Sequence, residues 1–338
     1  MDDRARLIDQ FLSQAGWSEA LAKPLAGDAS NRRYVRLSQG KKRAVLMDAP
    51  PTSGEDVRPF VTIATWLRNA GLSAPEILFE DPDNGLLLLE DLGDDIFVRV
   101  VADAPDQELP LYRAATDVLL SLHRLPAPDT LVAYTPQRMA EMTAPVYDWY
   151  LRGCGGDPSK SSGLVAPFQD ILEANCPETD VIILRDYHAE NLLWLPDRQG
   201  VARVGLLDFQ DALVGHRSYD LASLLQDIRR DVPLEIEEAM ILHYVEHSGL
   251  EEQRFRVAYA AQAVQRNLRI LGIFARLCLH SGKPHYVDYM PRLWSLILRG
   301  LNHPALAEVR TIVLKDLPEP NAALMKKLKD QCAKIPTP

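Results

Sequence analysis

The first ninety residues mix apolar positions at helical spacing with short runs of β-strand character. Spacings of three and four residues predict helices over residues 4–15 and 60–70, each followed by a glycine. Alternating or β-branched runs predict strands at residues 25–37 (around a small-residue turn), 43–48, 76–79 and 86–89. The N-terminal part is therefore expected to form a small antiparallel sheet accompanied by helices.

Beyond residue 95 the helical spacing dominates. An acidic stretch with a glycine, residues 90–95, follows the apolar run 86–89 and is the expected boundary between two lobes. Helices are expected around residues 111–123, 142–150, 218–228 and 257–275, with a peripheral helix in the tail. The pattern predicts an α+β protein, with a small lobe over residues 1–90 and a larger, mainly helical lobe over residues 91–338.

One stretch of the second lobe has strand character instead. Residues 181–184 form an apolar, β-branched run that ends in a polar turn containing Asp186 and Asn191. Residues 192–207 predict two more strands around a turn, and the second of them delivers Asp208 at its end. We expect this hairpin to place Asp186, Asn191 and Asp208 together at one end of a rigid support.

These three side chains suit phosphoryl transfer from a nucleotide, which asks a protein chiefly for positioning and charge neutralisation. Asp186 is the candidate catalytic base beside the attacking hydroxyl. Asn191 and Asp208 are candidate Mg²⁺ ligands, because Mg²⁺ prefers hard oxygen donors and few protein ligands. A single acid or amide in a turn is more often a solvated turn former, but the spacing D-x-x-x-x-N followed by a strand-terminal D-F is rare. ATP and Mg²⁺ are therefore the expected cofactors.

The same motifs resemble a known family. Asp186-x-His188-x-x-Asn191, Leu207-Asp208-Phe209 and Tyr219-Asp220-Leu221-Ala222 are similar to the catalytic core of the aminoglycoside-phosphotransferase-like kinases, relatives of the protein kinases. Within that superfamily, residues 27–34, 45–50 and 265–267 most resemble bacterial N-acetylmuramate/N-acetylglucosamine anomeric kinases. The resemblance spans roughly residues 25–300.

The resemblance implies a two-lobed, protein-kinase-like fold. It implies ATP-dependent phosphorylation of a sugar hydroxyl, most closely the anomeric 1-OH of N-acetylmuramate or N-acetylglucosamine in peptidoglycan recycling. It also implies that Asp220 accepts hydrogen bonds from the backbone of the catalytic loop. We expect His188, two residues after the base, to brace that loop by hydrogen bonding.

Candidate nucleotide contacts lie in the small lobe. The turn that contains Ser30 and Asn31 has small residues and backbone N–H groups suited to covering phosphates, although such a turn alone is more often a plain hairpin. Glu90 and Leu92 are candidates through main-chain atoms only, because an adenine can hydrogen-bond the backbone of the segment that links two lobes. An ordinary exposed loop is the alternative there.

The sequence departs from the kinase pattern at one position. Protein kinases place a phosphate-pairing lysine at the end of a V-A-I-K-like strand, and the matching position here is Met47. Arg32, Arg33 and Arg43 are candidates for the missing positive charge, and the sequence does not choose among them. Glu55 consequently stays without an assigned role.

Composition narrows the class of protein. The chain has 338 residues, 47% of them hydrophobic, and a net charge of −10, which argues against nucleic-acid binding. Four scattered cysteines are typical of free thiols in a reducing compartment, and neither a signal peptide nor a membrane-spanning run is recognisable. We expect a cytoplasmic enzyme with a small amino-sugar substrate, without membrane, nucleic-acid or obligate protein partners.

Several residues and alternatives concern the identity of the phosphate acceptor. Arg266 is a candidate partner for a substrate carboxylate, and Asp211 is a further candidate substrate contact. An aminoglycoside or other amino-alcohol kinase is the rival of the same class, since Asp91, Asp94 and Asp95 suit a cationic substrate. A nucleotide-binding pseudokinase that serves as a scaffold is the rival of another class, supported only by Met47.

Overall fold

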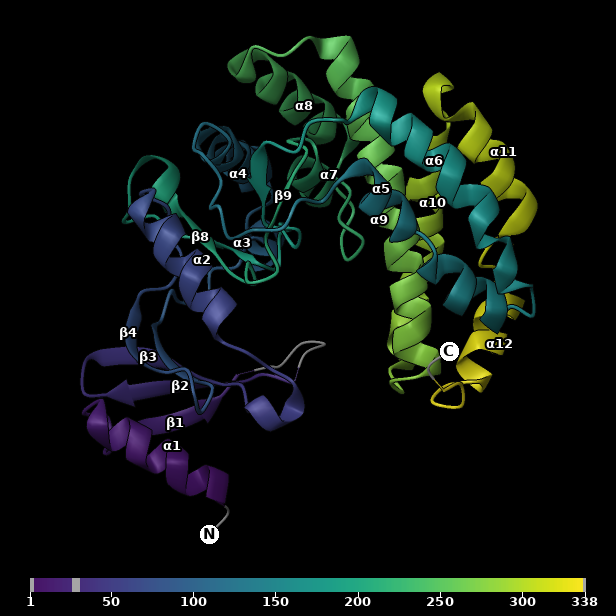
Figure 1. Cartoon of the computed structure of the whole chain (residues 1–338). Coiled ribbons are helices and arrows are strands. Elements are labelled where there is room, and N and C mark those ends of the chain that lie inside the picture. Colours follow the sequence, from purple (N-terminus) through teal and green to yellow (C-terminus); the bar gives the residue numbers. More distant parts are fainter. Residues whose placement is uncertain (1–2, 26–30, 337–338) are drawn as a thin grey trace. The chain divides into compact units, whose positions relative to one another are not determined.

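The computed structural model describes residues 3–25 and 31–336, and the chain divides into two compact units (Figure 1). Unit 1 comprises Met1–Val118 and Ala189–Ala212, and unit 2 comprises Leu119–His188 and Leu213–Pro338. The predicted lobe boundary after residue 90 lies inside unit 1. This unit also includes a segment from much later in the sequence.

Unit 1 is built on a five-stranded antiparallel sheet. Its strands are β1 (Leu21–Pro24), β2 (Arg33–Gln39), β3 (Lys42–Asp48), β5 (Leu86–Glu90) and β4 (Ile77–Asp81), in that spatial order. One face of the sheet packs against helix α1 (Asp3–Gln14), which Figure 1 shows beside the strands. Phe11 of α1 meets Leu37, Leu46 and Leu88 there, so alternate residues of three strands are buried on this side.

The remaining elements of unit 1 include a two-stranded hairpin, β7 (Leu192–Trp194) with β8 (Val204–Leu206). The Leu206 N–H donates to the Ser73 carbonyl at 2.9 Å, and the Ser73 hydroxyl donates to the Ala202 carbonyl at 2.6 Å. These bonds fasten the hairpin to the N-terminal part of the unit. The helices are α2 (Arg58–Asn69), α3 (Phe97–Asp103), most of α4 (Glu108–Leu122), and the short 3-10 helices Pro51–Ser53, Pro105–Gln107 and Gly200–Arg203.

Unit 2 is mainly helical and contains one small sheet. Its helices are α5 (Pro136–Glu141), α6 (Ser162–Asn175), α7 (Tyr219–Leu225), α8 (Leu234–Ser248), α9 (Glu252–Leu279), α10 (Met290–Leu301), α11 (Ala307–Asp316) and α12 (Ala322–Asp330), with a π-helix at Val146–Leu151 and 3-10 helices at Pro158–Ser161, Pro284–Tyr289 and Pro304–Leu306. Strand β6 (Val181–Ile183) pairs with β9 (Leu213–Gly215). Strand β6 thus belongs to a different sheet from the β7–β8 hairpin.

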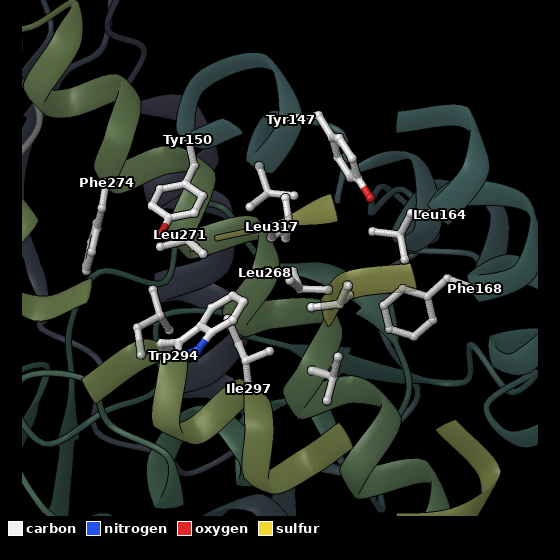
Figure 2. Close-up of a cluster of buried hydrophobic side chains, with 14 of the residues drawn as sticks. Tyr147, Tyr150, Leu164, Phe168, Leu268, Leu271, Phe274, Trp294, Ile297 and Leu317 are labelled. Carbon is white, nitrogen blue, oxygen red and sulfur yellow. The ribbon is translucent and has the colours of Figure 1, made fainter. Parts of the chain in front are cut away.

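The core of unit 2 surrounds α9, the longest helix (Figure 2). Leu268 and Leu271 of α9 meet aromatic side chains from the π-helix and from α10, among them Tyr150 and Trp294. Tyr147 and Trp149, which are aromatic residues in a segment expected to be helical, are buried in this cluster. None of the helices described in residues 3–25 and 31–336 is both long and apolar enough to span a membrane.

Candidate active site

A cavity of about 440 Å³ lies in unit 1 between the second face of the sheet and the hairpin segment. Its size falls within the range of small-molecule sites. Its apolar wall is formed by Leu25, Val45, Met47, Phe60, Pro75, Leu89, Leu92, Leu193 and Leu207. The register explains this wall, because the cross-strand pairs Tyr34–Met47 and Val45–Leu89 project to the face opposite α1.

Asn191 and Asp208 lie at the same end of the hairpin and both line this cavity. Asn191 precedes β7 and Asp208 follows β8 closely, and the Leu207 N–H donates to the Asn191 carbonyl at 3.0 Å. Asp208 has a φ of 56°, in the left-handed region that residues other than glycine rarely occupy. Its carboxylate accepts a hydrogen bond of 2.8 Å from the Gln210 amide. Strained backbone of this kind persists where the surrounding structure requires it, and it clusters at functional sites.

Another part of the cavity lining comes from the segment after β5. Glu90 and Leu92, the predicted main-chain contacts of an adenine, both line it. The Glu90 N–H donates to the Glu76 carbonyl at 2.8 Å, and its carboxylate pairs with Arg68 and Arg198. The Glu90 side chain is thus occupied within the protein, so any nucleotide contact of this residue falls to its carbonyl.

Ser30 lies outside the described residues, whereas Asn31 is placed. The Asn31 N–H donates to the Glu55 carboxylate at 3.1 Å and its side chain donates to the Ser53 carbonyl at 3.3 Å. The neighbouring Arg32, one of three candidate cations, lines the cavity and pairs with the same carboxylate at 2.9 Å. Glu55 had no assigned role in the sequence; the structure places it beside Asn31 and Arg32.

The proposed base, Asp186, belongs to unit 2, in the loop after β6. Asp220 of α7 is completely buried and accepts hydrogen bonds from the N–H groups of Leu184 at 2.6 Å and Arg185 at 2.9 Å. Arg185 has a φ of 71°, and its carbonyl accepts a bond of 3.1 Å from the Ser223 hydroxyl. These contacts, of the kind the family resemblance implied, hold the backbone that carries Asp186.

His188 is buried in the same loop. Its Nε2 lies 2.9 Å from Arg229 Nη1, and because a guanidinium only donates, Nε2 accepts and the ring proton is on Nδ1. Burial lowers the pKa of His188 well below its usual 6.5, and Arg229 and Arg266 add to the effect. His188 is therefore neutral, and its contact with Arg229 links this loop to the segment after α7.

Two positive side chains lie near Asp186, the proposed base. Arg266 and Arg269 of α9 both lie close enough to Asp186 to interact with its charge. Arg266 is 4% exposed, and its Nη1 finds no hydrogen-bond partner within the described part of the chain. A buried guanidinium nitrogen is costly unless a partner compensates it. Asp211, the other candidate substrate contact, instead lines the cavity of unit 1.

The fold and these residues define a phosphotransferase. The model of the phosphotransferase enzyme family matches residues 22–272, and the chain belongs to this family. A solved spectinomycin phosphotransferase in complex with ADP and spectinomycin has a TM-score of 0.57 at 13% identity, covering 97% of this chain and 98% of its own. The predicted α+β, protein-kinase-like fold class is confirmed.

More similar relatives share one name. A Caulobacter vibrioides protein named N-acetylmuramate/N-acetylglucosamine kinase is 37% identical over an alignment 338 positions long, which covers 89% of this chain and 93% of that protein. A Pseudomonas aeruginosa protein of the same name is 34% identical over 327 residues, with 93% and 94% covered. The family resemblance inferred from the motifs is therefore confirmed.

Proposed function

We propose that this chain is an ATP-dependent kinase that phosphorylates the anomeric 1-hydroxyl of N-acetylmuramate and N-acetylglucosamine. The names of its relatives support this acceptor, and the ADP complex of a protein with the same fold supports the nucleotide. The observation that carries the proposal is the cavity of unit 1, with Asn191 and Asp208 at one of its ends. A role in peptidoglycan recycling places the enzyme in the cytoplasm, where ATP is available.

The side chains at that end fit Mg²⁺. The amide oxygen of Asn191 and the carboxylate of Asp208 are hard donors, and a site with few protein ligands leaves positions for phosphate oxygens and water. Bound there, Mg²⁺ supplies neutralisation of the nucleotide phosphates. Asn191 and Asp208 would hold it, while the apolar wall around Val45 and Leu193 receives the adenine.

Asp186 orients the acceptor hydroxyl and takes its proton as the hydroxyl oxygen bonds to the γ-phosphorus of ATP, while the bond from that phosphorus to the departing ADP breaks. The hydrogen bonds of Asp220 fix the backbone of the preceding residue, so the carboxylate of Asp186 is positioned before the substrate arrives. His188 remains neutral and supports the same loop through Arg229.

The charges around Asp186 favour an anionic acceptor. N-acetylmuramate carries a lactyl carboxylate, and Arg266, with one buried nitrogen lacking a partner within the described residues, is suited to bind it. An aminoglycoside is cationic, and the interactions of Arg266 and Arg269 with the base disfavour such a substrate. This contrast separates the proposal from the rival of the same class.

The test is product analysis with the purified full-length chain, ATP, Mg²⁺ and each candidate acceptor. We expect a sugar 1-phosphate from N-acetylmuramate and N-acetylglucosamine and none from an aminoglycoside. The Asp186→Asn variant should lose turnover while it binds nucleotide nearly as well as the wild type. Phosphorylated antibiotic as the sole product, or nucleotide binding without any ATP consumption, would contradict the proposal and favour the amino-alcohol kinase or the pseudokinase, respectively.

A further inference from the structure

The cavity of unit 1 lacks a lysine where kinases carry one. Met47 occupies that position on β3, is 1% exposed and contributes an apolar side chain to the cavity wall. A nucleotide with several phosphate charges still needs a cation beside the metal ligands. The cationic side chains that line this cavity are the candidates for that charge.

Two cationic side chains line the cavity within the described residues, Arg32 and Arg36. Arg36 lies in the part of the cavity formed by the segment after β5, and its guanidinium is paired there. Its guanidinium pairs with Asp91 and Asp94, each at 2.8 Å, and donates to the Gly93 carbonyl at 3.1 Å. Arg36 thus closes that segment onto the sheet and is unsuited to the phosphate end.

Arg32 lies at the end that holds the candidate metal ligands. Its Nη1 is 3.9 Å from Asp208 Oδ1, and its Nε donates to Glu55 Oε2 at 2.9 Å. The side chains of Arg32 and Glu55 are only 13% and 14% exposed, so this ion pair is largely shielded from solvent. The hydrogen bond from Nε to Glu55 fixes the orientation of the guanidinium. It therefore also fixes the direction of the outer edge, which carries Nη1 and Nη2.

The other two candidate cations are placed elsewhere. Arg33 is 64% exposed and pairs with Asp48 at 2.8 Å, its cross-strand neighbour. Arg43 is exposed and pairs in register with Ser38. Neither lines the cavity. The structure thereby distinguishes among three arginines that the sequence left equivalent.

We propose that Arg32 binds the nucleotide phosphates in place of the missing lysine, and that Glu55 is its positioning residue. This inference rests on the proposed function only in that a nucleotide occupies the cavity. An arginine offers a planar fork that bonds two phosphate oxygens at once, whereas a lysine acts as a point charge. The ion pair that protein kinases form between strand β3 and a helix is here formed between the residue before β2 and the segment before α2.

The experiment compares the affinities of ATP, ADP and adenosine for the full-length protein by calorimetry, with Mg²⁺ and without sugar. Arg32→Met should weaken ATP and ADP binding by roughly 10- to 100-fold, the effect of losing charge-assisted hydrogen bonds, and leave adenosine within about twofold. The matched control is Arg33→Met, which removes an adjacent arginine outside the cavity and should leave all three affinities unchanged.

A second set of variants distinguishes loss of phosphate binding from misfolding of the Arg32→Met protein. Arg32→Lys keeps the charge and should bind ADP with an affinity between those of the wild type and Arg32→Met. Adding Met47→Lys to Arg32→Met should recover part of the lost ADP affinity. Glu55→Gln should weaken ADP binding less than Arg32→Met does, and should add nothing in the double variant, because a positioning residue acts through its partner.

Two results would overturn the proposal. Unchanged ATP affinity in Arg32→Met would show that this guanidinium does not bind phosphate. Equal losses for ATP and adenosine would show that Arg32 only shapes the cavity. The test measures nucleotide binding and not sugar turnover, so it remains valid even if the proposed sugar acceptor is wrong. If the wild-type protein bound no nucleotide, both proposals would be overturned.

Discussion

The carboxylate of Asp220 holds the backbone of Arg185 in a left-handed conformation, through a hydrogen bond of 2.9 Å from the Arg185 N–H. An arginine at a φ of 71° is unfavourable by itself, so the contact stabilises a strained residue immediately before the proposed base. Asp220 is fully buried on helix α7, and we propose that it acts by positioning this loop.

Replacing Asp220 with Asn should therefore reduce both stability and turnover. An Asn amide accepts through one oxygen only and presents N–H donors to the second backbone N–H group, so one bond is lost inside the core. We expect a loss of about 2–4 kcal/mol in the free energy of unfolding and at least about a tenfold fall in kcat. Denaturant unfolding and kinetics at saturating sugar measure both; an unchanged kcat would contradict the positioning role.

The same carboxyl group predicts a dependence of stability on pH. Burial raises the pKa of Asp220 from 3.8 to about 7, despite its backbone hydrogen bonds, which oppose the shift. Between these values the folded state holds a proton that the unfolded chain releases, so this contribution to stability is lost as pH rises from about 4 to about 7. Asp220→Asn removes the group and should remove this slope.

Unfolding free energies measured at several pH values provide the test. Burial lowers the pKa of His123 to about 3 and of His216 to about 4, which makes stability rise with pH through about 6.5. The prediction therefore concerns the difference in unfolding free energy between wild type and variant, in which the contributions of His123 and His216 cancel. Parallel curves for the two proteins would refute it.

Asp208→Asn separates the proposed role of this residue in metal binding from its role in the backbone conformation. Asn tolerates a positive φ as Asp does and keeps an oxygen acceptor for the Gln210 amide, so the fold should persist. Losing the negative charge should lower kcat by at least about 100-fold and raise the Mg²⁺ concentration needed for activity. Asp197→Asn, in the exposed turn of the same hairpin, is the control and should behave as the wild type.

Arg266→Lys tests the anionic acceptor. Loss of the planar fork should raise KM for N-acetylmuramate by roughly tenfold and leave KM for N-acetylglucosamine, which has no carboxylate, nearly unchanged. If Arg266 acts only on the charge of Asp186, kcat should fall equally for both sugars. Steady-state kinetics with the two sugars distinguish these outcomes.

Gly272→Ala tests the packing of α9 against the π-helix. A Cβ atom at Gly272 would lie 2.3 Å from the Pro145 backbone carbon, so we expect a loss of several kcal/mol, although Ala is the better helix former by about 1 kcal/mol. Gly163 of α6 is a matched control because a Cβ there would meet nothing within 4 Å. Gly163→Ala should be neutral or slightly stabilising in thermal unfolding.

Local patterns predicted most elements of the fold. The apolar runs that became β3 and β5 and the spacing that became α2 and α9 are signals carried by adjacent residues. Strand β9 was not among the strands expected from the sequence. Its three residues are too few to show periodicity, and it exists because Leu213 pairs with Ile183, far away in the sequence.

Some residues of the candidate site were likewise predictable from local patterns, and others were not. Asn191 and Asp208 were predicted because each closely adjoins a recognisable strand, and the hairpin brings them together. The pairing of Arg32 with Glu55 was not predictable, because it depends on where a segment before β2 lies relative to one 23 residues later. Arg269 went unrecognised because an arginine on an amphipathic helix is usually solvated.

Unit 1 is assembled from two stretches that flank residues 119–188. Because a ribosome releases the chain from its N-terminus, the sheet emerges long before Leu193, Leu207 and Asp208, which complete the cavity. The cavity face of the sheet therefore lacks these contacts while residues 119–188 of unit 2 are being synthesised. We therefore expect the N-terminal third of the chain to complete its folding only after Asp208 has been synthesised.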